Sequence, residues 1–194
     1  MILTSRRSVL ATAGLLAMGL AGCSNTQGPV SASTSTGAKR AAIDAEVDAA
    51  LAELYRTRPG ARQLADRAKA ILVFPSITQA GFGVGGLYGT GAMREGGRTT
   101  GYYNIAGGTI GFQIGGQSFS QAYFFNTADA LETFRKTKGF ELGAGLTAVA
   151  ADFGANGEIT TSTLQKPLVV VTWGQSGLMA GATIEGAKIT EINP

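Results

Sequence analysis

Glycine is concentrated in one segment of this 194-residue chain, and that concentration limits the folds available to it. Fourteen glycines lie among the 36 residues 81–116, and apolar residues alternate with them at Phe82 and Val84, with Leu87 following. Alternation with a period of two is typical of a β-strand, and glycine within a strand permits bulges, sharp coiling and close backbone approach. The segment therefore predicts a strongly coiled, barrel-like sheet rather than a helix or a linker.

Helical periodicity precedes the glycine-rich segment. Residues 40–57 place apolar side chains on one stripe, with acidic residues in the first turns and Arg56 near the end, which predicts a helix. The stripe consists of Ile43, Val47, Leu51 and Leu54. Pro59-Gly60 ends this helix, and a second, shorter helix is expected over 61–69.

Strand and turn signals follow the two helices. The apolar run 71–74 predicts a short buried strand that stops at Pro75, and Arg94-Glu95-Gly96-Gly97-Arg98 predicts a hairpin turn. Asn126 has the position of an N-cap for a short helix with Asp129 in its first turn.

The C-terminal part of the chain repeats the strand signals. Strands are predicted over 140–150, 168–173, 178–184 and 187–192, with turns at Asn156-Gly157, 174–177 and 185–186. Trp173 ends the most strand-like run and is expected in the core. Together these signals predict an α+β fold with short N-terminal helices and about seven or more largely antiparallel strands.

Residues 1–22 are predicted to be a lipoprotein signal peptide. Arg6 and Arg7 form a basic start, an apolar stretch over 9–21 follows, and Leu20-Ala21-Gly22-Cys23 matches the bacterial lipobox. We expect Cys23, the only cysteine, to carry a diacylglycerol group and fatty acyl chains such as palmitate. Two or three acyl chains anchor a protein stably in a membrane.

The leader also bears on the export route and the location. Ser5-Arg6-Arg7-Ser8-Val9-Leu10 matches the twin-arginine pattern, so export of the folded domain and export of the unfolded chain both stay open. Residues 23–38 are expected to be the acylated cysteine and a flexible tether, because their polar composition cannot bury enough surface to offset chain entropy. Residues 39–194 are expected to form a single domain on the periplasmic side of the bacterial envelope. Ser24, in place of an aspartate, favours the outer membrane over the inner membrane.

Most catalytic chemistry is excluded by what the sequence lacks. The absence of histidine removes imidazole-based catalysis and imidazole metal sites, and one cysteine cannot form a cysteine cluster. The Asp and Glu residues between positions 129 and 191 are scattered singly and are expected to be solvated surface carboxylates. We therefore expect a protein that is not an enzyme and that has no metal and no cofactor.

Gly81-Phe82-Gly83-Val84-Gly85-Gly86 matches the literal pattern of a dinucleotide-binding loop. A nucleotide site requires a helix after the loop and an acidic residue about 20 residues further on. Strand-like residues follow this segment instead, and Tyr102 and Tyr103 occupy the place of the acidic residue. A coiled glycine-rich strand without nucleotide binding is therefore predicted.

One charged cluster stands out around the end of the first helix. Without the leader arginines the chain has 14 Lys and Arg against 13 Asp and Glu, and a net charge of +1 favours no nucleic-acid partner. Five cations opposed locally only by Asp66 nevertheless lie close together: Arg56, Arg58, Arg62, Arg67 and Lys69. Arginine matches phosphate oxygens bidentately, so the cluster predicts contact with phospholipid headgroups, with a solvated helical face as the alternative. Arg135, Lys136 and Lys138 are candidates for extending it.

Five ordered segments between about residue 61 and residue 193 resemble the SYLF domain family, in the branch carried by bacterial envelope lipoproteins. The segments are AKAILVFP (68–75), GFGVGG (81–86), GTG (89–91), GTIGFQIGGQ (108–117) and GLMAGATIEGAKI (177–189). The eukaryotic branch has Trp-Ser-Pro after the hairpin, where this chain has Thr100-Gly101-Tyr102-Tyr103-Asn104. The actin-linked role of that branch is therefore not expected here.

The resemblance implies association with phosphoinositides and other anionic phospholipids, and it implies no catalytic residues. Arg62, Arg67 and Lys69 occupy the region nearest to the basic lipid-binding part of the family. The predicted function is that of a non-enzymatic envelope lipoprotein whose domain contacts anionic headgroups or accepts an acyl chain against its sheet. The alternative is a structural lipoprotein whose sheet edge binds another envelope protein or a second copy of itself.

Overall fold

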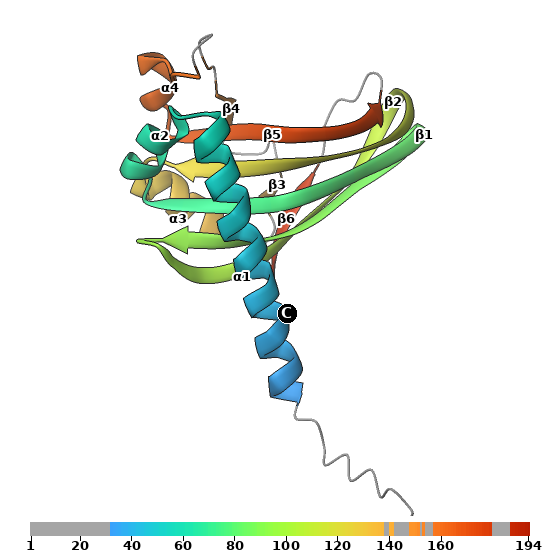
Figure 1. Cartoon of the computed structure of the whole chain (residues 1–194), viewed down its shortest axis with the longest axis horizontal. Helices are drawn as coiled ribbons and strands as arrows, with labels where there is room; N and C mark the ends of the chain where they lie inside the picture. The colour runs from blue at the N-terminus through green and yellow to red at the C-terminus, as the bar shows by residue number, and fades with distance from the viewer. Residues whose placement is uncertain (1–31, 138–139, 142–147, 152, 154–156, 180–186) are drawn as a thin grey trace, which may run out of the picture. The chain divides into compact units, whose positions relative to one another are not determined.

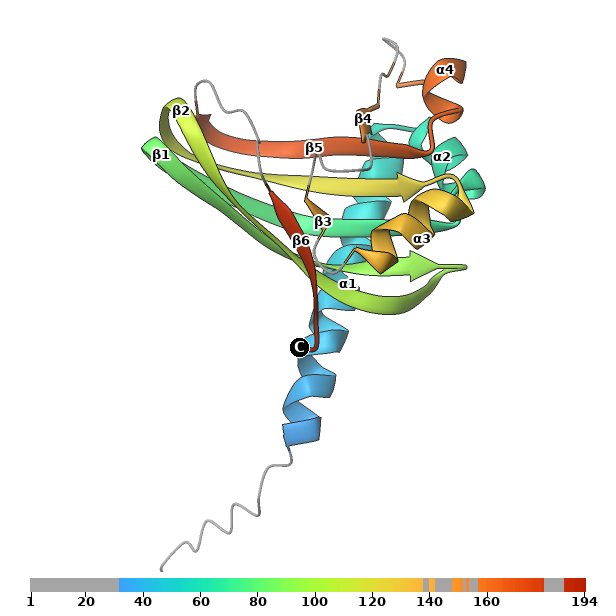
Figure 2. The same ribbon diagram turned by 180° about the vertical axis from the view of Figure 1, so that it is seen from behind.

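The computed structural model describes residues 32–137, 140–141, 148–151, 153, 157–179 and 187–194. In chain order the elements are α1 (Ala32–Thr57), α2 (Ala61–Arg67), β1 (Ala70–Glu95), β2 (Arg98–Phe125), α3 (Ala128–Lys136), β3 (Phe140–Glu141), β4 (Val149–Ala150), α4 (Thr161–Leu164), β5 (Leu168–Met179) and β6 (Lys188–Ile192). Helices α2, α3 and α4 lie around one end of the sheet, and bent strands form its other end (Figures 1 and 2). The predicted α+β class is confirmed.

Strands β1 and β2 form one long antiparallel hairpin. Its register runs from the pair Ala70–Phe125 to the pair Glu95–Arg98. The turn at 96–97 has φ angles of 55° and 78°, which glycine adopts without strain. The predicted hairpin turn is therefore confirmed, although the strands beside it are much longer than those expected from the sequence.

Each strand of the hairpin bends in its middle, where glycine is densest (Figure 1). The pairing register shifts between Phe82 and Val84, and Gly83 between them has a φ of 71°. The bend brings the two halves of β1 close together, since a Cβ built on Gly91 would lie 1.9 Å from the carbonyl oxygen of Val73. Only glycine permits this approach.

Strand β2 is the centre of a single open sheet with the order β3-β6-β2-β5-β4, and β1 pairs with β2 along its length. The first half of β2 pairs with β6 and the second half with β5. All pairings between the described strands are antiparallel except that of β4 with β5. The expected largely antiparallel sheet is confirmed. The barrel-like closure is not, because the glycines bend two long strands instead of joining the first strand to the last.

Successive side chains of the sheet enter two different core clusters. On β1, Leu72 belongs to one cluster and Val73 to the other. Helix α3 adds Phe134 to the first cluster, and α1 adds Val47 and Leu54 to the second. Burial on both faces explains why the start of β1 is apolar at consecutive positions.

Helix α1 packs on the sheet with the predicted stripe. Val47 and Leu54 are fully buried, and Ile43 and Leu51 are partly buried against the same cluster. The helix begins at Ala32 rather than at residue 40, and its first turns extend past the sheet (Figures 1 and 2). The tether predicted over 23–38 is therefore wrong for residues 32–38, which continue α1 ahead of the part that packs on the sheet.

A polar network fixes α1 to the hairpin turn. The Asp44 carboxylate accepts hydrogen bonds from Thr99 Oγ1 at 2.7 Å and from the Tyr102 hydroxyl at 3.0 Å. The Arg94 guanidinium donates to Asp48 Oδ1 at 2.6 Å and to the backbone oxygen of Asp44 at 3.0 Å. The Arg94 side chain is only 13% exposed, so these partners stabilise its charge.

Two residues that predict the end of a strand in the sequence lie instead at bulges inside longer strands. Pro75 lies inside β1 at a register shift, and a proline at a bulge removes no ladder hydrogen bond. Gly174, with a φ of 65°, lies inside β5 opposite a register shift in β2. A bulge therefore replaces the turn predicted at 174–177, and β5 runs on to Met179.

Several shorter predictions have mixed outcomes. Thr127 caps α3, accepting from the Ala130 amide at 3.2 Å, whereas Asn126 donates to the carbonyl of Lys166. Only β3 and β4 represent the strand predicted over 140–150, and residues 142–147 lie outside the described residues. The same holds for 180–186, which include most of the return strand predicted over 178–184. The final predicted strand is present as β6.

Candidate functional site

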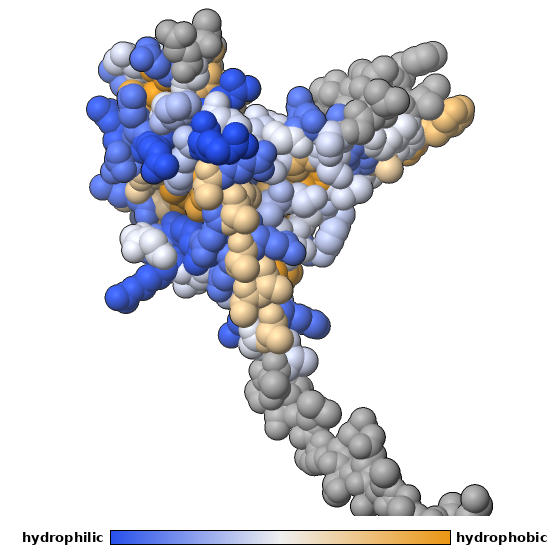
Figure 3. Space-filling view, in the orientation of Figure 1, coloured by the Kyte–Doolittle hydropathy of each residue, from blue (hydrophilic) through white to orange (hydrophobic). Residues whose placement is uncertain are grey.

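The predicted basic cluster lies at the corner formed by the end of α1, helix α2 and the start of β1. Arg56 is in the last turn of α1, Arg58 follows it, Arg62 and Arg67 are on α2, and Lys69 directly precedes β1. All five side chains are exposed, and hydrophilic residues gather over this part of the surface (Figure 3). We call these five residues the basic corner.

Two arginines of the basic corner lie over aromatic rings. The guanidinium carbon of Arg62 is 4.9 Å from the centroid of the Tyr55 ring, and that of Arg58 is 5.7 Å from the centroid of Phe153. Such a contact orients a guanidinium without neutralising its charge. Within the described part of the chain, none of the five side chains forms an ion pair. Their charge is therefore available to an external anion.

Tyr55 links the two helices of the basic corner. Burial raises the pKa of the Tyr55 hydroxyl, the positive charge of Arg62 opposes that rise, and Asp66 adds to it. The ring is therefore neutral at physiological pH and offers its face to the Arg62 guanidinium. The Asp66 carboxylate places one negative charge near the Tyr55 hydroxyl, within the basic corner.

The cations of α3 do not extend the basic corner. Arg135 forms an ion pair with Glu95, and Lys136 Nζ lies 2.6 Å from Glu132 Oε1. The hydrogen bond between Lys136 and Glu132 raises the pKa of the lysine and lowers that of the glutamate. Both cations are thus already matched by carboxylates, and Lys138 lies outside the described residues.

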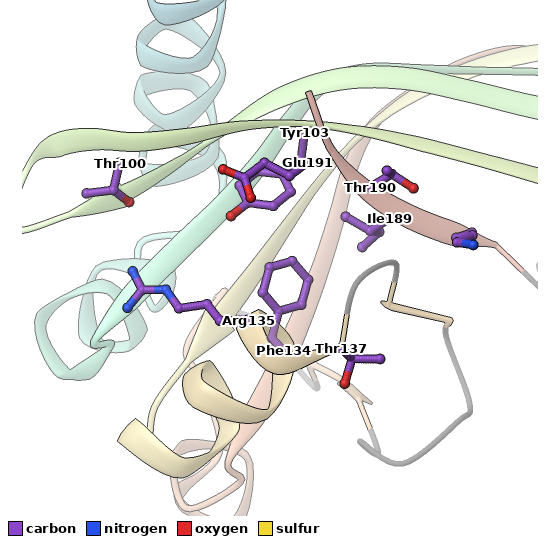
Figure 4. Close-up of a pocket in the computed structure, with 9 residues that line it drawn as sticks. Thr100, Tyr103, Phe134, Arg135, Thr137, Ile189, Thr190 and Glu191 are labelled. Carbon is purple, nitrogen blue, oxygen red and sulfur yellow. The ribbon is translucent and has the colours of Figure 1, made fainter. Parts of the chain in front are cut away.

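A pocket of about 590 Å³ lies between α3, β2 and β6 and was not predicted from the sequence (Figure 4). Its floor is apolar and consists of Tyr103, Phe134 and Ile189. Burial raises the pKa of Tyr103, and the Glu191 carboxylate adds to this rise, so the hydroxyl remains neutral. The floor residues lie far apart in the sequence; the pairing of β6 with β2 brings Ile189 beside Tyr103, and α3 packs Phe134 against the Tyr103 ring at 5.5 Å between centroids.

The rim of this pocket carries both signs of charge. Arg135 is engaged by Glu95, which also accepts a hydrogen bond from Thr100, and Lys188 and Glu191 both line the rim. The balanced rim gives no net attraction for an anion. The basic corner is therefore the stronger candidate for binding a phosphate group.

The structure also bears on the glycine pattern at 81–86 and on Trp173. The glycine pattern at 81–86 lies within β1 and no helix follows it, so the strand prediction is confirmed. Trp173 is 5% exposed, as expected for a core residue. No helix in the described residues is long and apolar enough to cross a membrane, and no group of potential metal ligands occurs there. Cys23 and the leader lie outside the described residues.

Comparison with known proteins finds one family that the C-terminal part of the chain resembles. Residues 106–193 match the family model described as Ysc84, Las17-binding protein actin regulator. The match begins within β2 and ends just after β6, and it contains the GTIGFQIGGQ and GLMAGATIEGAKI segments. No curated protein matches the chain. Residues 106–193, less than half of the chain, are therefore similar to the Ysc84 family, and this match supports the resemblance of that part to the SYLF domain.

Proposed function

We propose that this chain is a non-enzymatic lipoprotein of the bacterial envelope whose domain binds anionic phospholipid headgroups. The SYLF domain is associated with lipid binding and with actin regulation. One observation carries the proposal: five exposed cations occupy one corner of the domain, and none has a carboxylate partner among the described residues. Cations without partners on a membrane-tethered domain favour an anionic surface as the ligand.

In the proposed binding, arginines would donate paired hydrogen bonds to phosphate and Lys69 would contribute a single ammonium charge. Four of the cations are arginines, whose guanidinium groups donate two parallel hydrogen bonds to a phosphate. Each cation near an anionic membrane surface contributes on the order of 1 kcal/mol, so the basic corner alone binds weakly and reversibly. Acyl groups on Cys23 would supply the lasting attachment and would hold the domain at a high local concentration beside the lipid.

The proposed location is the periplasmic side of the envelope, with the outer membrane favoured by Ser24. Export through the twin-arginine route is compatible with the leader and would deliver the folded domain. The acylated Cys23 and the export route are testable by mass spectrometry of the mature protein and by deletion of the twin-arginine translocase.

Charge reversal at the basic corner tests the headgroup contact. We would use the chain that starts at Ser24, because the described core clusters lie wholly beyond that point. Arg62→Glu with Arg67→Glu should reduce co-sedimentation with anionic vesicles roughly tenfold or more, since two cations, each worth on the order of 1 kcal/mol at such a surface, become anions and the net charge falls by four units. The matched control, Lys136→Glu with Lys188→Glu, changes net charge equally on α3 and β6.

The control separates a local site from the net charge of the protein. If both double variants lose binding equally, the basic corner is not the site and only the overall charge matters. If neither variant loses binding, headgroup recognition by these residues is wrong.

Protein interaction is the second candidate function. The family description names a protein-binding regulator, and β1 pairs only with β2 in the described sheet, which leaves its other edge without a strand. Crosslinking in cells distinguishes the two candidates. A single dominant crosslinked partner that persists after reversal of Arg62 and Arg67 would favour this candidate.

A further inference from the structure

The bent end of the hairpin exposes large apolar side chains. Phe82, Val84 and Tyr88 are 79%, 70% and 55% exposed, and they are the exposed large hydrophobic residues of the described chain. An apolar area is visible at the far end of the arm formed by β1 and β2 (Figure 3). Single exposed apolar residues are normal, but three grouped at the bend of one element mark a contact surface. We call Phe82, Val84 and Tyr88 the hairpin tip.

The charged residues of β1 and β2 are confined to the turn that joins them, at Arg94, Glu95 and Arg98. No Asp, Glu, Lys or Arg occurs from 70 to 93 on β1 or from 99 to 125 on β2. At the bend, Phe82 is paired with Ile114 and Val84 with Ile110, so four apolar residues share this part of the ladder. Moving a charged side chain from water into hydrocarbon costs more free energy than moving any other kind of side chain. A segment without charged residues is therefore suited to contact with the apolar part of a bilayer.

We propose that the hairpin tip inserts into the boundary between the headgroups and the acyl chains of a phospholipid bilayer. This inference rests on the proposed function, because a membrane-tethered domain is what keeps the tip beside lipid. Phe82 and Val84 supply apolar surface, and Tyr88 supplies an aromatic ring whose hydroxyl can stay at the headgroup level.

The exposed area favours a bilayer over a second copy of the chain. At about 150–250 Å² for an aromatic side chain, the three residues expose on the order of 350 Å² together. A stable dimer buries about 800 Å² on each partner, more than twice this area. Contact with a bilayer requires no minimum buried area of this kind. A domain anchored beside the lipid is at high local concentration and needs only a weak additional contact.

The hairpin tip and the basic corner together define an orientation. The start of β1, beside the basic corner, and the bend lie at opposite ends of the first half of the strand (Figures 1 and 2), and Ala70 and Phe82 are at most about 40 Å apart at the usual rise of a strand. Both can meet one bilayer only when this half of β1 lies along the membrane surface. The proposal therefore predicts a domain lying on its side, with the headgroup contact at one end and the apolar contact at the other.

A depth-sensitive quenching experiment tests the insertion directly. The chain that starts at Cys23 is coupled through its single thiol to maleimide lipid in vesicles of phosphatidylcholine and phosphatidylglycerol. Phe82→Trp reports the hairpin tip, and Arg98→Trp reports the opposite, exposed end of the hairpin as the matched control. Trp173 is buried in the core and provides a constant background that also reports folding.

Insertion predicts that lipid brominated along the acyl chains quenches the added emission of Phe82→Trp at least about threefold more than that of Arg98→Trp, as expected for an apolar contact at acyl depth. Adding Val84→Ser to the Phe82→Trp protein, at a site too exposed to matter for folding, should weaken the quenching of the added emission by brominated lipid and increase its quenching by iodide in the water. Equal quenching at both positions overturns the proposal, and so does quenching that depends on protein density, which would indicate a second copy. The covalent link to lipid holds the domain at the membrane without headgroup binding. The quenching at the hairpin tip can therefore be measured even if the basic corner does not bind headgroups.

Discussion

At the residue scale, the closest backbone approach in the hairpin depends on one glycine. A Cβ at Gly91 would lie 1.9 Å from the carbonyl oxygen of Val73, whereas a Cβ at Gly108 would meet nothing within 4 Å. We predict that Gly91→Ala lowers the free energy of unfolding by at least about 2 kcal/mol, because the two halves of β1 must separate. Gly108→Ala should change it by less than about 0.5 kcal/mol. Urea unfolding measures both, and equal effects would contradict the close approach.

A buried tyrosine makes the protein less stable at alkaline pH. Tyr123 is 1% exposed and donates to Gln121 Oε1 at 2.7 Å, and burial raises its pKa well above the ordinary value. Above about pH 10 the unfolded chain loses this proton while the folded chain keeps it, so stability falls as pH rises, by up to about 1.4 kcal/mol per pH unit for this group. Tyr123→Phe should therefore flatten the decline between about pH 10 and pH 11.

The control for this prediction is internal. The variant loses a buried hydrogen bond, so it starts about 1–2 kcal/mol lower at neutral pH, but its stability should then decline less steeply. Parallel curves for both proteins in urea unfolding across the pH range would show that Tyr123 does not retain its proton in the folded state.

At the element scale, α1 is held by a polar network as well as by its apolar stripe. The Asp44 side chain is 31% exposed and accepts two hydrogen bonds from β2, whereas that of Asp48 is 70% exposed and meets only Arg94. We predict that Asp44→Ala costs about 2 kcal/mol and raises hydrogen exchange across α1. Asp48→Ala should cost less than about 1 kcal/mol, as an exposed ion pair does. If both variants lost the same free energy of unfolding, Asp44 would not be the main polar contact between α1 and β2.

The elements also show where sequence reasoning succeeds. Helices α1 and α2 are predictable because their apolar periodicity and the Pro59-Gly60 break are local. The lengths of β1, β2 and β5 are not, because Pro75 and Gly174 lie at bulges that look like strand ends in the sequence. Whether a glycine ends a strand or bends it depends on the partner strand, which periodicity does not reveal.

At the scale of the whole molecule, the basic corner was predictable because its five residues are close in sequence. The pocket beside α3 was not, because its floor joins β2, α3 and β6. The hairpin tip was hidden in a different way. Phe82 and Val84 look like core residues of an alternating strand, and only the bend leaves them exposed.

The central claim is that the domain itself recognises anionic headgroups. The most direct test is co-sedimentation of the chain that starts at Ser24 with neutral and anionic vesicles, from about 50 mM to about 500 mM salt. The account predicts binding to anionic vesicles that fades as screening increases, with little binding to neutral ones. Equal, salt-insensitive binding to both would contradict headgroup recognition and leave apolar contact alone. No binding to either would contradict the claim entirely and put the protein-partner function first.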